Sequence, residues 1–149
     1  LPLWRGGQEL AGTGPTGFVA GGNGARVLVV EDDPDIVLVL QELLRTGGYE
    51  HVAVSTGAAA LEALQTQSFD AVLLDLHLPD RNGRTLVREF RAKVAPRRLL
   101  IIILSATFGP NEFRDAQLLG VEDCLEKPVD GPRLLESLRA HVQAASTVQ

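Results

Sequence analysis

The apolar stretch 71–74 ends directly on an acidic residue, Asp75, and a loop that contains Pro79 and Gly83 follows it. An unbroken apolar run of this length is typical of a strand buried on both faces. The proline and glycine prevent the strand from continuing. Asp75 is therefore expected at the carboxyl end of a core strand, where open α/β sheets bind their ligands. Taken alone, the stretch fits equally well an aspartate that only caps loop amides.

The same order of apolar strand, polar strand end and helix recurs along the chain. Strands are predicted at 27–30, 51–54, 71–74, 99–104 and 123–125, and helices at 34–45, 58–65, 84–93, 111–119 and 131–144. Such alternation requires right-handed crossovers and a parallel sheet covered by helices on both faces. The fold class is therefore predicted as α/β, a five-stranded, doubly wound parallel sheet with (βα)5 order, and the family resemblance described below implies that it is flavodoxin-like.

Polar residues follow four of the predicted strands, and parallel strands all end at one edge of the sheet. We therefore expect these residues to gather there: Glu31, Asp32, Asp33, Asp75, Ser105 and Lys127. Crowded carboxylates repel one another unless a cation offsets their charge. A cluster of oxygen ligands without histidine or cysteine favours Mg²⁺. A hydroxyl and an ammonium group beside it suit phosphoryl transfer, in which an aspartate can be the nucleophile.

Composition excludes several other classes of function. A net charge of -5 argues against a nucleic-acid-binding surface, which needs clustered lysine and arginine. The single cysteine excludes an internal disulfide and fits a reducing compartment. The sequence shows neither a membrane-spanning apolar run nor a signal peptide. We therefore expect a cytoplasmic domain that contacts neither nucleic acid nor membrane.

The chain divides into three predicted parts. Residues 1–25 are rich in glycine and lack apolar periodicity, so we expect a disordered linker or tail. Residues 26–144 form the domain, and 145–149 form a C-terminal tail. The stretch 12–17 matches the GxGxxG string of dinucleotide-binding proteins, but it lacks the flanking strand and helix that give the string its meaning.

From Arg26 to about Val142 the chain resembles a CheY-like receiver domain of two-component response regulators. The matching segments are Val29-Val30-Glu31-Asp32-Asp33-Pro34, Leu74-Asp75 with Pro79 and Gly83, Leu104-Ser105-Ala106, and Lys127-Pro128. The resemblance implies that Asp75 accepts a phosphoryl group from a phosphohistidine. The donor would be a histidine kinase or a histidine phosphotransfer domain.

The resemblance also implies roles for the residues around Asp75. Glu31, Asp32 and the backbone carbonyl of His77 would complete a Mg²⁺ site with Asp75. The Ser105 hydroxyl and the Ala106 amide would contact the phosphoryl oxygens, and Lys127 would pair with the phosphate. The Lys127–Pro128 bond is expected to be cis, as such bonds are an X-Pro feature.

Two positions depart from the pattern of the family. Cys124 stands three positions before the lysine, where the family usually has a tyrosine or phenylalanine that changes rotamer on phosphorylation. The signal is therefore expected to leave by another route. Glu31 makes the acidic pair Glu-Asp instead of Asp-Asp, and we expect its longer side chain to reach the metal through water.

Several alternatives stay open at this point. An aspartate-nucleophile phosphatase is one, because Asp33-Pro34-Asp35 mimics its DxD motif. A receiver-fold binding module that is never phosphorylated is another. Residues 1–4 faintly resemble the last strand of a histidine-kinase ATP-binding domain, which suggests the C-terminal receiver of a hybrid sensor kinase, with a stand-alone regulator as the alternative. The whole protein would be a kinase only in the hybrid case. A homodimer is a further alternative to a monomer.

The first predicted helix is apolar at five consecutive positions, 36–40, whereas one apolar stripe is enough to cover a sheet. Part of this run should stay exposed. Histidine-containing bundles dock on the first helix in the family, so our hypothesis is that Val37 or Leu38 forms a docking face. The alternative is that a neighbouring segment, such as the N-terminal tail, covers it.

Overall fold

The computed structural model describes residues 24–106 and 109–147, without the side chains of 112, 113 and 143–147. The predicted tail 1–25 therefore lies almost entirely outside the described residues, together with the stretches 1–4 and 12–17. Strands and helices alternate without exception in the described parts: β1 (Arg26–Val30), α1 (Pro34–Thr46), β2 (Glu50–Val54), α2 (Gly57–Thr66), β3 (Ala71–Asp75), α3 (Gly83–Val94), β4 (Leu100–Ser105), α4 (Pro110–Leu119), β5 (Asp123–Glu126) and α5 (Gly131–Thr147).

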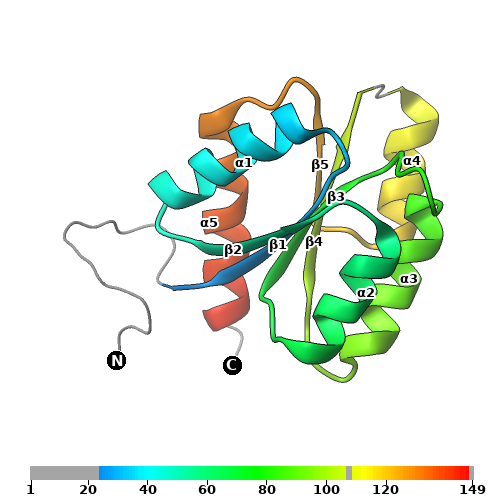
Figure 1. Cartoon of the computed structure of the whole chain (residues 1–149), viewed down its shortest axis with the longest axis horizontal. Helices are drawn as coiled ribbons and strands as arrows, with labels where there is room; N and C mark the ends of the chain where they lie inside the picture. Colours follow the sequence, from blue (N-terminus) through cyan, green and yellow to red (C-terminus); the bar gives the residue numbers. More distant parts are fainter. Residues whose placement is uncertain (1–23, 107–108, 148–149) are drawn as a thin grey trace.

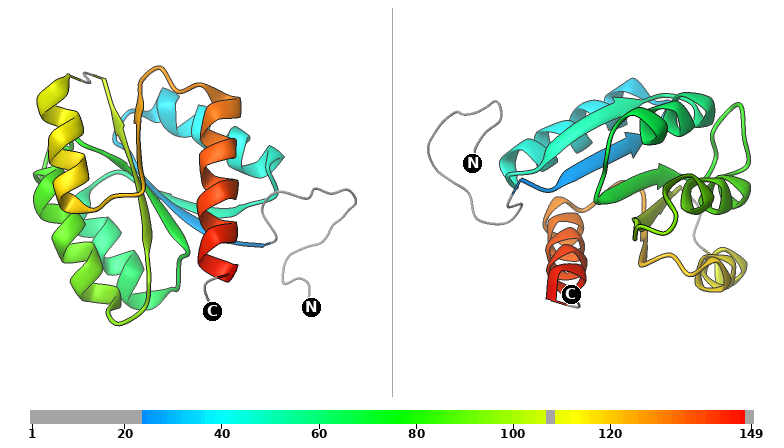
Figure 2. Two further views of the ribbon diagram at one scale, coloured as in Figure 1. Left: turned by 180° about the vertical axis from the view of Figure 1, so that it is seen from behind. Right: turned by 90° about the horizontal axis from the view of Figure 1, so that it is seen from below.

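The strands form one five-stranded sheet in the order β2-β1-β3-β4-β5, and every neighbouring pair is parallel (Figure 1). Helices α1 and α5 cover one face, while α2, α3 and α4 cover the other (Figure 2). The predicted fold class is confirmed.

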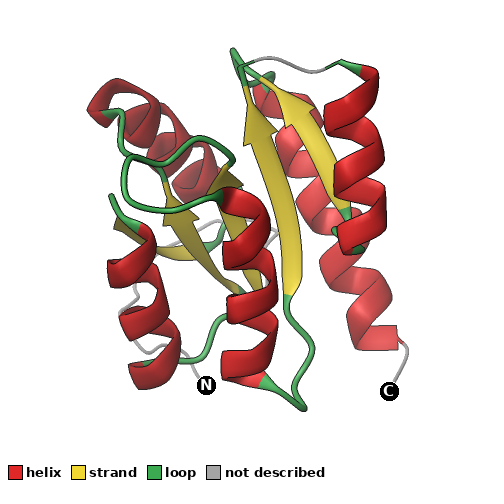
Figure 3. Ribbon diagram, turned by 90° about the vertical axis from the view of Figure 1, so that its right-hand side faces the viewer, coloured by secondary structure: helices red, strands yellow, loops and turns green. Residues whose placement is uncertain are grey.

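Helices flank the sheet on both sides (Figure 3). Two apolar layers, one on each side of the sheet, form the core. Successive residues of β1 alternate between them: Leu28 and Val30 pack toward α2 and α3, and Val27 and Val29 pack toward α1 and α5. All residues of β3 and β4 are buried. Burial on both faces is the physical reason why these strands are unbroken apolar runs.

Most element ends differ by one residue from the sequence-based expectation, and three of the differences concern polar residues of the sheet edge or the predicted tail. β3 and β4 each include the polar residue that was expected just beyond the strand, because Asp75 pairs with Leu104 and Ser105 pairs with Glu126 in the parallel ladder. α5 runs to Thr147, so part of the segment 145–149 that was predicted as a tail is helical.

Among the described residues, no helix is both long and apolar enough to cross a bilayer.

A polar cluster at the start of β5 attaches this edge strand to α5. The carboxylate of Asp123 accepts a hydrogen bond from the Ser137 hydroxyl at 2.7 Å and lies 3.0 Å from the guanidinium of Arg133. Burial raises the pKa of Asp123, but the hydrogen bonds from Ser137 and the Cys124 amide, with the charge of Arg133, outweigh burial and lower the pKa overall. The folded protein therefore favours ionised Asp123.

We expect Asp123→Asn to lower the free energy of unfolding by about 1–2 kcal/mol at pH 7, because it removes a charge-assisted contact. A carboxylate whose folded pKa is lowered contributes fully above its unfolded pKa of about 3.9 and loses that contribution as the pH falls through the folded pKa. The difference between the two proteins should therefore shrink below about pH 3.9. Urea titrations at several pH values measure it. Glu136→Gln, on the exposed side of α5, is the control. If D123N lowers the free energy of unfolding by the same amount at every pH, the account is contradicted.

Candidate functional site

The carboxyl edge of the sheet brings residues from four strand ends together. Glu31 follows β1, Asp75 ends β3, Ser105 ends β4, and Lys127 follows β5. Backbone hydrogen bonds continue the sheet through these positions: the Leu76 amide donates to the Leu104 carbonyl at 3.1 Å, and the Lys127 amide donates to the Ser105 carbonyl at 2.8 Å. The Glu31 amide likewise donates to the Val54 carbonyl at 3.1 Å, so the main chain fixes where all four side chains start.

The ammonium group of Lys127 lies between two buried carboxylates. It is 2.8 Å from Oε1 of Glu31 and 3.2 Å from Oδ1 of Asp75. The Glu31 and Asp75 side chains are only 1% and 5% exposed, and that of Lys127 is 14% exposed. Asp75 Oδ1 also accepts a hydrogen bond from the His77 amide at 3.1 Å.

Burial and ion pairing shift the pKa values of Glu31 and Lys127 in opposite directions. Burial raises the pKa of Glu31, although hydrogen bonds from Lys127 and the Asp33 amide act in the opposite direction. Burial lowers the pKa of Lys127, but its contacts with Glu31 and Asp75 outweigh burial and raise that pKa overall. A lysine with a raised pKa stays charged at neutral pH and loses its stabilising charge only in strongly alkaline solution. The pocket therefore keeps a permanent positive charge next to Asp75.

Glu31, Asp32 and Asp75 can each direct a carboxylate oxygen to a common point, because these atoms lie within 4.8 Å of one another. Asp32 is exposed, whereas the other two are buried. A set of oxygen donors with net negative charge fits a hard cation such as Mg²⁺. The structure thus brings together three of the acidic residues that the sequence places at this edge, Glu31, Asp32 and Asp75. The carboxylate of one further acidic residue lies outside this group.

The exception is Asp33. It is the N-cap of α1, where its Oδ1 accepts a hydrogen bond from the Asp35 amide at 2.9 Å, ahead of Pro34 in the first turn. A capping aspartate before a proline at N1 is a recognisable sequence signal. Its exclusion from the acidic cluster could therefore have been predicted.

Other predicted residues are found near this edge. Ser105 is fully buried at the end of β4, and Ala106 is exposed just after it. The Lys127–Pro128 bond is cis, as expected. The His77 side chain is exposed. Cys124 is half-buried on β5 and packs against the apolar layer on the α2 and α3 side.

An apolar cavity of about 200 Å³ adjoins the acidic cluster, between the amino end of α1 and the loop after β5. It is lined by Asp35, Ile36, Val39, Leu40, Lys127, Pro128 and Val129. On α1 itself, Leu38 is 65% and Val39 53% exposed, while Leu40 and Leu44 are buried. The expectation that part of this run stays exposed is confirmed.

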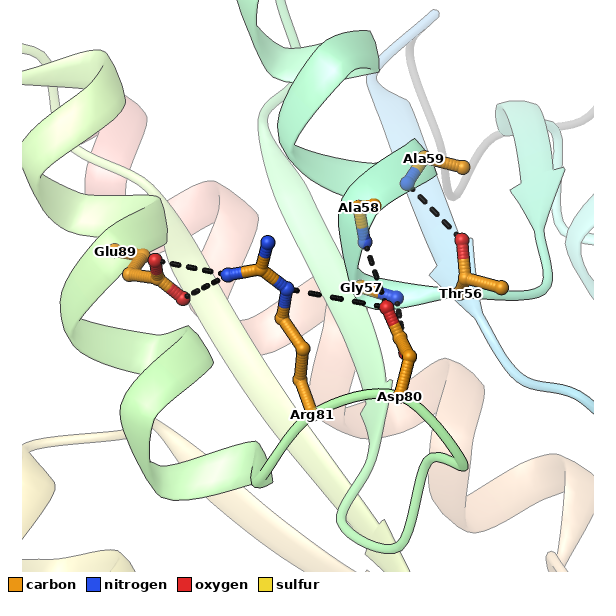
Figure 4. A network of polar contacts seen from close by, with 7 residues as sticks. All are labelled: Thr56, Gly57, Ala58, Ala59, Asp80, Arg81 and Glu89. Atoms are coloured by element: carbon orange, nitrogen blue, oxygen red, sulfur yellow. Dashed lines mark hydrogen bonds and ion pairs between the residues drawn. The ribbon is translucent and has the colours of Figure 1, made fainter.

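Sequence reasoning missed the role of Asp80, in the loop between β3 and α3 (Figure 4). Its carboxylate accepts hydrogen bonds from the amides of Gly57 and Ala58, at the amino end of α2. The two segments are 23 residues apart in sequence. No local pattern could have revealed the contact, because only the fold brings them together.

Comparison with known proteins agrees with this geometry. A family model described as "Response regulator receiver domain" matches residues 27–139. The chain is 40% identical over 114 residues to the sensor protein GacS of Pseudomonas syringae, covering 74% of the chain and 13% of that protein. It is 33% identical over 115 residues to the sensory/regulatory protein RpfC of Xanthomonas campestris, covering 76% of the chain and 16% of that protein. The chain thus spans only a small part of these relatives.

Among solved structures, the receiver domain of sensor histidine kinase PA1611 from Pseudomonas aeruginosa is similar, with a TM-score of 0.73 and 32% identity. The match covers 80% of this chain and 98% of that one, and that structure has a magnesium ion coordinated in its active-site cleft. A CheY-like receiver from Methanospirillum hungatei, at 22% identity and a TM-score of 0.78, supports the fold; that match covers 85% of this chain and 100% of that one.

We expect Lys127→Met to lower the free energy of unfolding by about 3 kcal/mol at pH 7, because it leaves two buried carboxylates without a counter-charge. Urea unfolding in the presence of EDTA measures the change without interference from divalent cations. Lys93→Met, at an exposed position of α3, is the matched control and should change stability by less than about 0.5 kcal/mol. Equal effects of the two substitutions would contradict the role given to Lys127.

Proposed function

The chain belongs to the response regulator receiver domain family of two-component signal transduction, and on that basis we propose that Asp75 is the residue on which it accepts a phosphoryl group. The observation that carries the proposal is the position of the Asp75 carboxylate. It lies buried at the carboxyl edge of the sheet, 3.2 Å from the Lys127 ammonium and within the cluster formed with Glu31 and Asp32.

The proposed reaction is a direct phosphoryl transfer. A carboxylate oxygen of Asp75 forms a bond to phosphorus while the phosphorus–nitrogen bond of a phosphohistidine breaks, and the imidazole nitrogen keeps the bonding electron pair. The product is an acyl phosphate, which brings about -1.5 to -2 charge units into the pocket. Lys127 would offset that charge, and the Ser105 hydroxyl and Ala106 amide would contact the phosphoryl oxygens.

Glu31, Asp32 and Asp75, with the backbone carbonyl of His77, would hold a Mg²⁺ ion. When bound, such an ion neutralises charge on the phosphoryl oxygens and orients them. The support within this chain is the set of three carboxylates that approach one another within 4.8 Å. Lys127 already pairs with two of them, which limits the repulsion in the cluster.

The placement of Asp33 argues against a phosphatase-like hydrolase. Such an enzyme would need both acids of Asp33-Pro34-Asp35 at the reacting centre, but Asp33 is bound to the Asp35 amide as the cap of α1. A receiver only labels itself and then loses the label slowly, whereas a hydrolase turns over phosphate esters.

We further propose that the phosphodonor, a histidine kinase or a histidine phosphotransfer domain, docks on α1. The support is the exposure of Leu38 and Val39, of which Val39 also lines the apolar cavity beside Lys127. Because relatives such as GacS are sensor proteins far longer than this chain, the proposed context is a receiver within a hybrid sensor kinase. Such a receiver would be cytoplasmic, where a reduced Cys124 is expected.

Incubation with acetyl phosphate and Mg²⁺ should add one phosphoryl group per molecule, detected by intact mass. Asp75→Asn should abolish the adduct, because an amide cannot form an acyl phosphate. Asp33→Asn should still be labelled, since Asp33 caps α1 outside the acidic cluster. Failure of the wild type to form an adduct, or an adduct that survives D75N, would overturn the assignment of Asp75.

Leu38→Asp should slow phosphoryl transfer from a phosphorylated histidine phosphotransfer domain by roughly tenfold or more, because a charge would be placed on an apolar docking face. Transfer from acetyl phosphate, which needs no docking, should be unchanged. Leu118→Asp is the matched control, since Leu118 is 79% exposed on α4, away from this face. If L38D transfers at the wild-type rate, or L118D is slowed equally, α1 is not the docking face.

A further inference from the structure

The loop between β3 and α3, residues 76–82, has little packing beneath it. It lines an open, polar hollow of about 410 Å³, and the residues that line the hollow are those of the loop itself. Leu78, at 8% exposure, and the half-buried Leu76 pack against the core, whereas the other five residues of the loop are exposed. The loop nevertheless holds the His77 amide 3.1 Å from the Asp75 carboxylate. Contacts other than core packing must therefore fix its shape.

Both ends of the loop are fixed by the regular elements. At one end, the Leu76 amide donates to the Leu104 carbonyl. At the other end, Asn82 caps α3, and a Cβ added to Gly83 would lie 2.8 Å from the Leu76 carbonyl oxygen. Gly83 thus permits a close approach of the two ends that no other residue allows. The segment between them, 77–81, depends on further contacts.

Asp80 supplies a contact to α2. Its Oδ1 accepts a hydrogen bond from the Gly57 amide at 2.9 Å, and its Oδ2 accepts one from the Ala58 amide at 3.2 Å (Figure 4). These amides belong to the first turn of a helix, where they have no partner within the helix and where a negative charge is favoured. In keeping with this, the hydrogen bond from Gly57 is the main cause that lowers the pKa of Asp80.

Arg81 supplies a contact to α3. Its guanidinium lies 3.1 Å from the Glu89 carboxylate and 3.8 Å from that of Asp80 (Figure 4). A Cβ added to Gly57 would come within 3.0 Å of the Arg81 side chain. Asp80 and Arg81, which we call the loop tether, therefore connect the middle of the loop to α2 and α3 at once.

α2 does not need Asp80 as its only cap. Thr56 is the N-cap of α2, and its hydroxyl oxygen accepts a hydrogen bond from the Ala59 amide at 3.1 Å. Asp80 takes the two amides before that one. The Thr56 contact is local to the helix, whereas the Asp80 contact connects the helix to the loop that begins at Asp75.

We propose that Asp80 is a positioning residue for phosphoryl acceptance: it holds the loop so that the His77 amide stays against the Asp75 carboxylate. Asp80 itself touches no reacting atom. It acts through the backbone of 77–79, which is otherwise held by the buried Leu78 side chain and the bridge between His77 and Asn82. The inference rests on the proposed function of Asp75, and it adds a residue outside the acidic cluster of Glu31, Asp32 and Asp75.

The test compares Asp80→Ala with Thr56→Ala, which removes a hydrogen bond at the same helix end without touching the loop. Two quantities are measured on the whole chain: the rate of adduct formation with acetyl phosphate and Mg²⁺, and amide hydrogen exchange of 76–82 without Mg²⁺. We expect D80A to slow adduct formation by roughly tenfold, as small displacements of reacting groups do, and to speed exchange in the loop. T56A should leave both quantities near wild type. Asp80→Asn, whose amide oxygen can still accept a hydrogen bond, should lie closer to wild type than D80A.

The inference is overturned if D80A forms the adduct within twofold of the wild-type rate, if exchange of 76–82 is unchanged, or if T56A slows the reaction as much as D80A. In each of these cases the wild type still forms an Asp75-dependent adduct, so the proposed function stands. Absence of an adduct on the wild type overturns the proposed function and this inference together.

Discussion

The contact on which the site depends is the one between the Lys127 ammonium and the two buried carboxylates of Glu31 and Asp75. Two carboxylates this deeply buried would repel each other and take up protons if no cation lay between them. At 2.8 Å and 3.2 Å, Lys127 compensates both. It also joins β1, β3 and the loop after β5, three segments that are far apart in sequence. Under the proposed function, the charge that stabilises the free pocket would also face the incoming phosphoryl group.

The sheet is what makes this contact possible. Because all five strands are parallel, their carboxyl ends meet at one edge, and each crossover returns the chain to the opposite edge. β3 and β4 are buried along their whole length, and their polar residues, Asp75 and Ser105, stand at their carboxyl ends. The loops that follow are then fixed by side chains to neighbouring helices, as Asp80 is to α2. The strands thus place the polar side chains of the site, and side-chain contacts such as that of Asp80 hold the loops that follow.

Much of this could be predicted from the sequence, and the physical reason is that the informative signals are local. Unbroken apolar runs, a proline or glycine after each, and one polar residue at each strand end were enough to predict the fold and the meeting of Glu31, Asp75, Ser105 and Lys127. The capping role of Asp33 was equally local but was masked by its neighbours in the acidic run. The contact of Asp80 with α2 could not be predicted, since it joins segments 23 residues apart. The inclusion of Asp75 in β3 was also missed, because it depends on pairing with Leu104.

The central claim is that, among several acids at this edge, Asp75 alone forms the acyl phosphate. Glu31 is just as buried and pairs with the same lysine, so burial and charge do not by themselves distinguish the two. Reduction of the phosphorylated protein with borohydride converts an aspartyl phosphate to homoserine, and peptide mapping then locates the modified residue. The account predicts conversion at Asp75 and at no other acid of the chain. Conversion at Asp32 or Asp33, or reduction of Glu31, would contradict it.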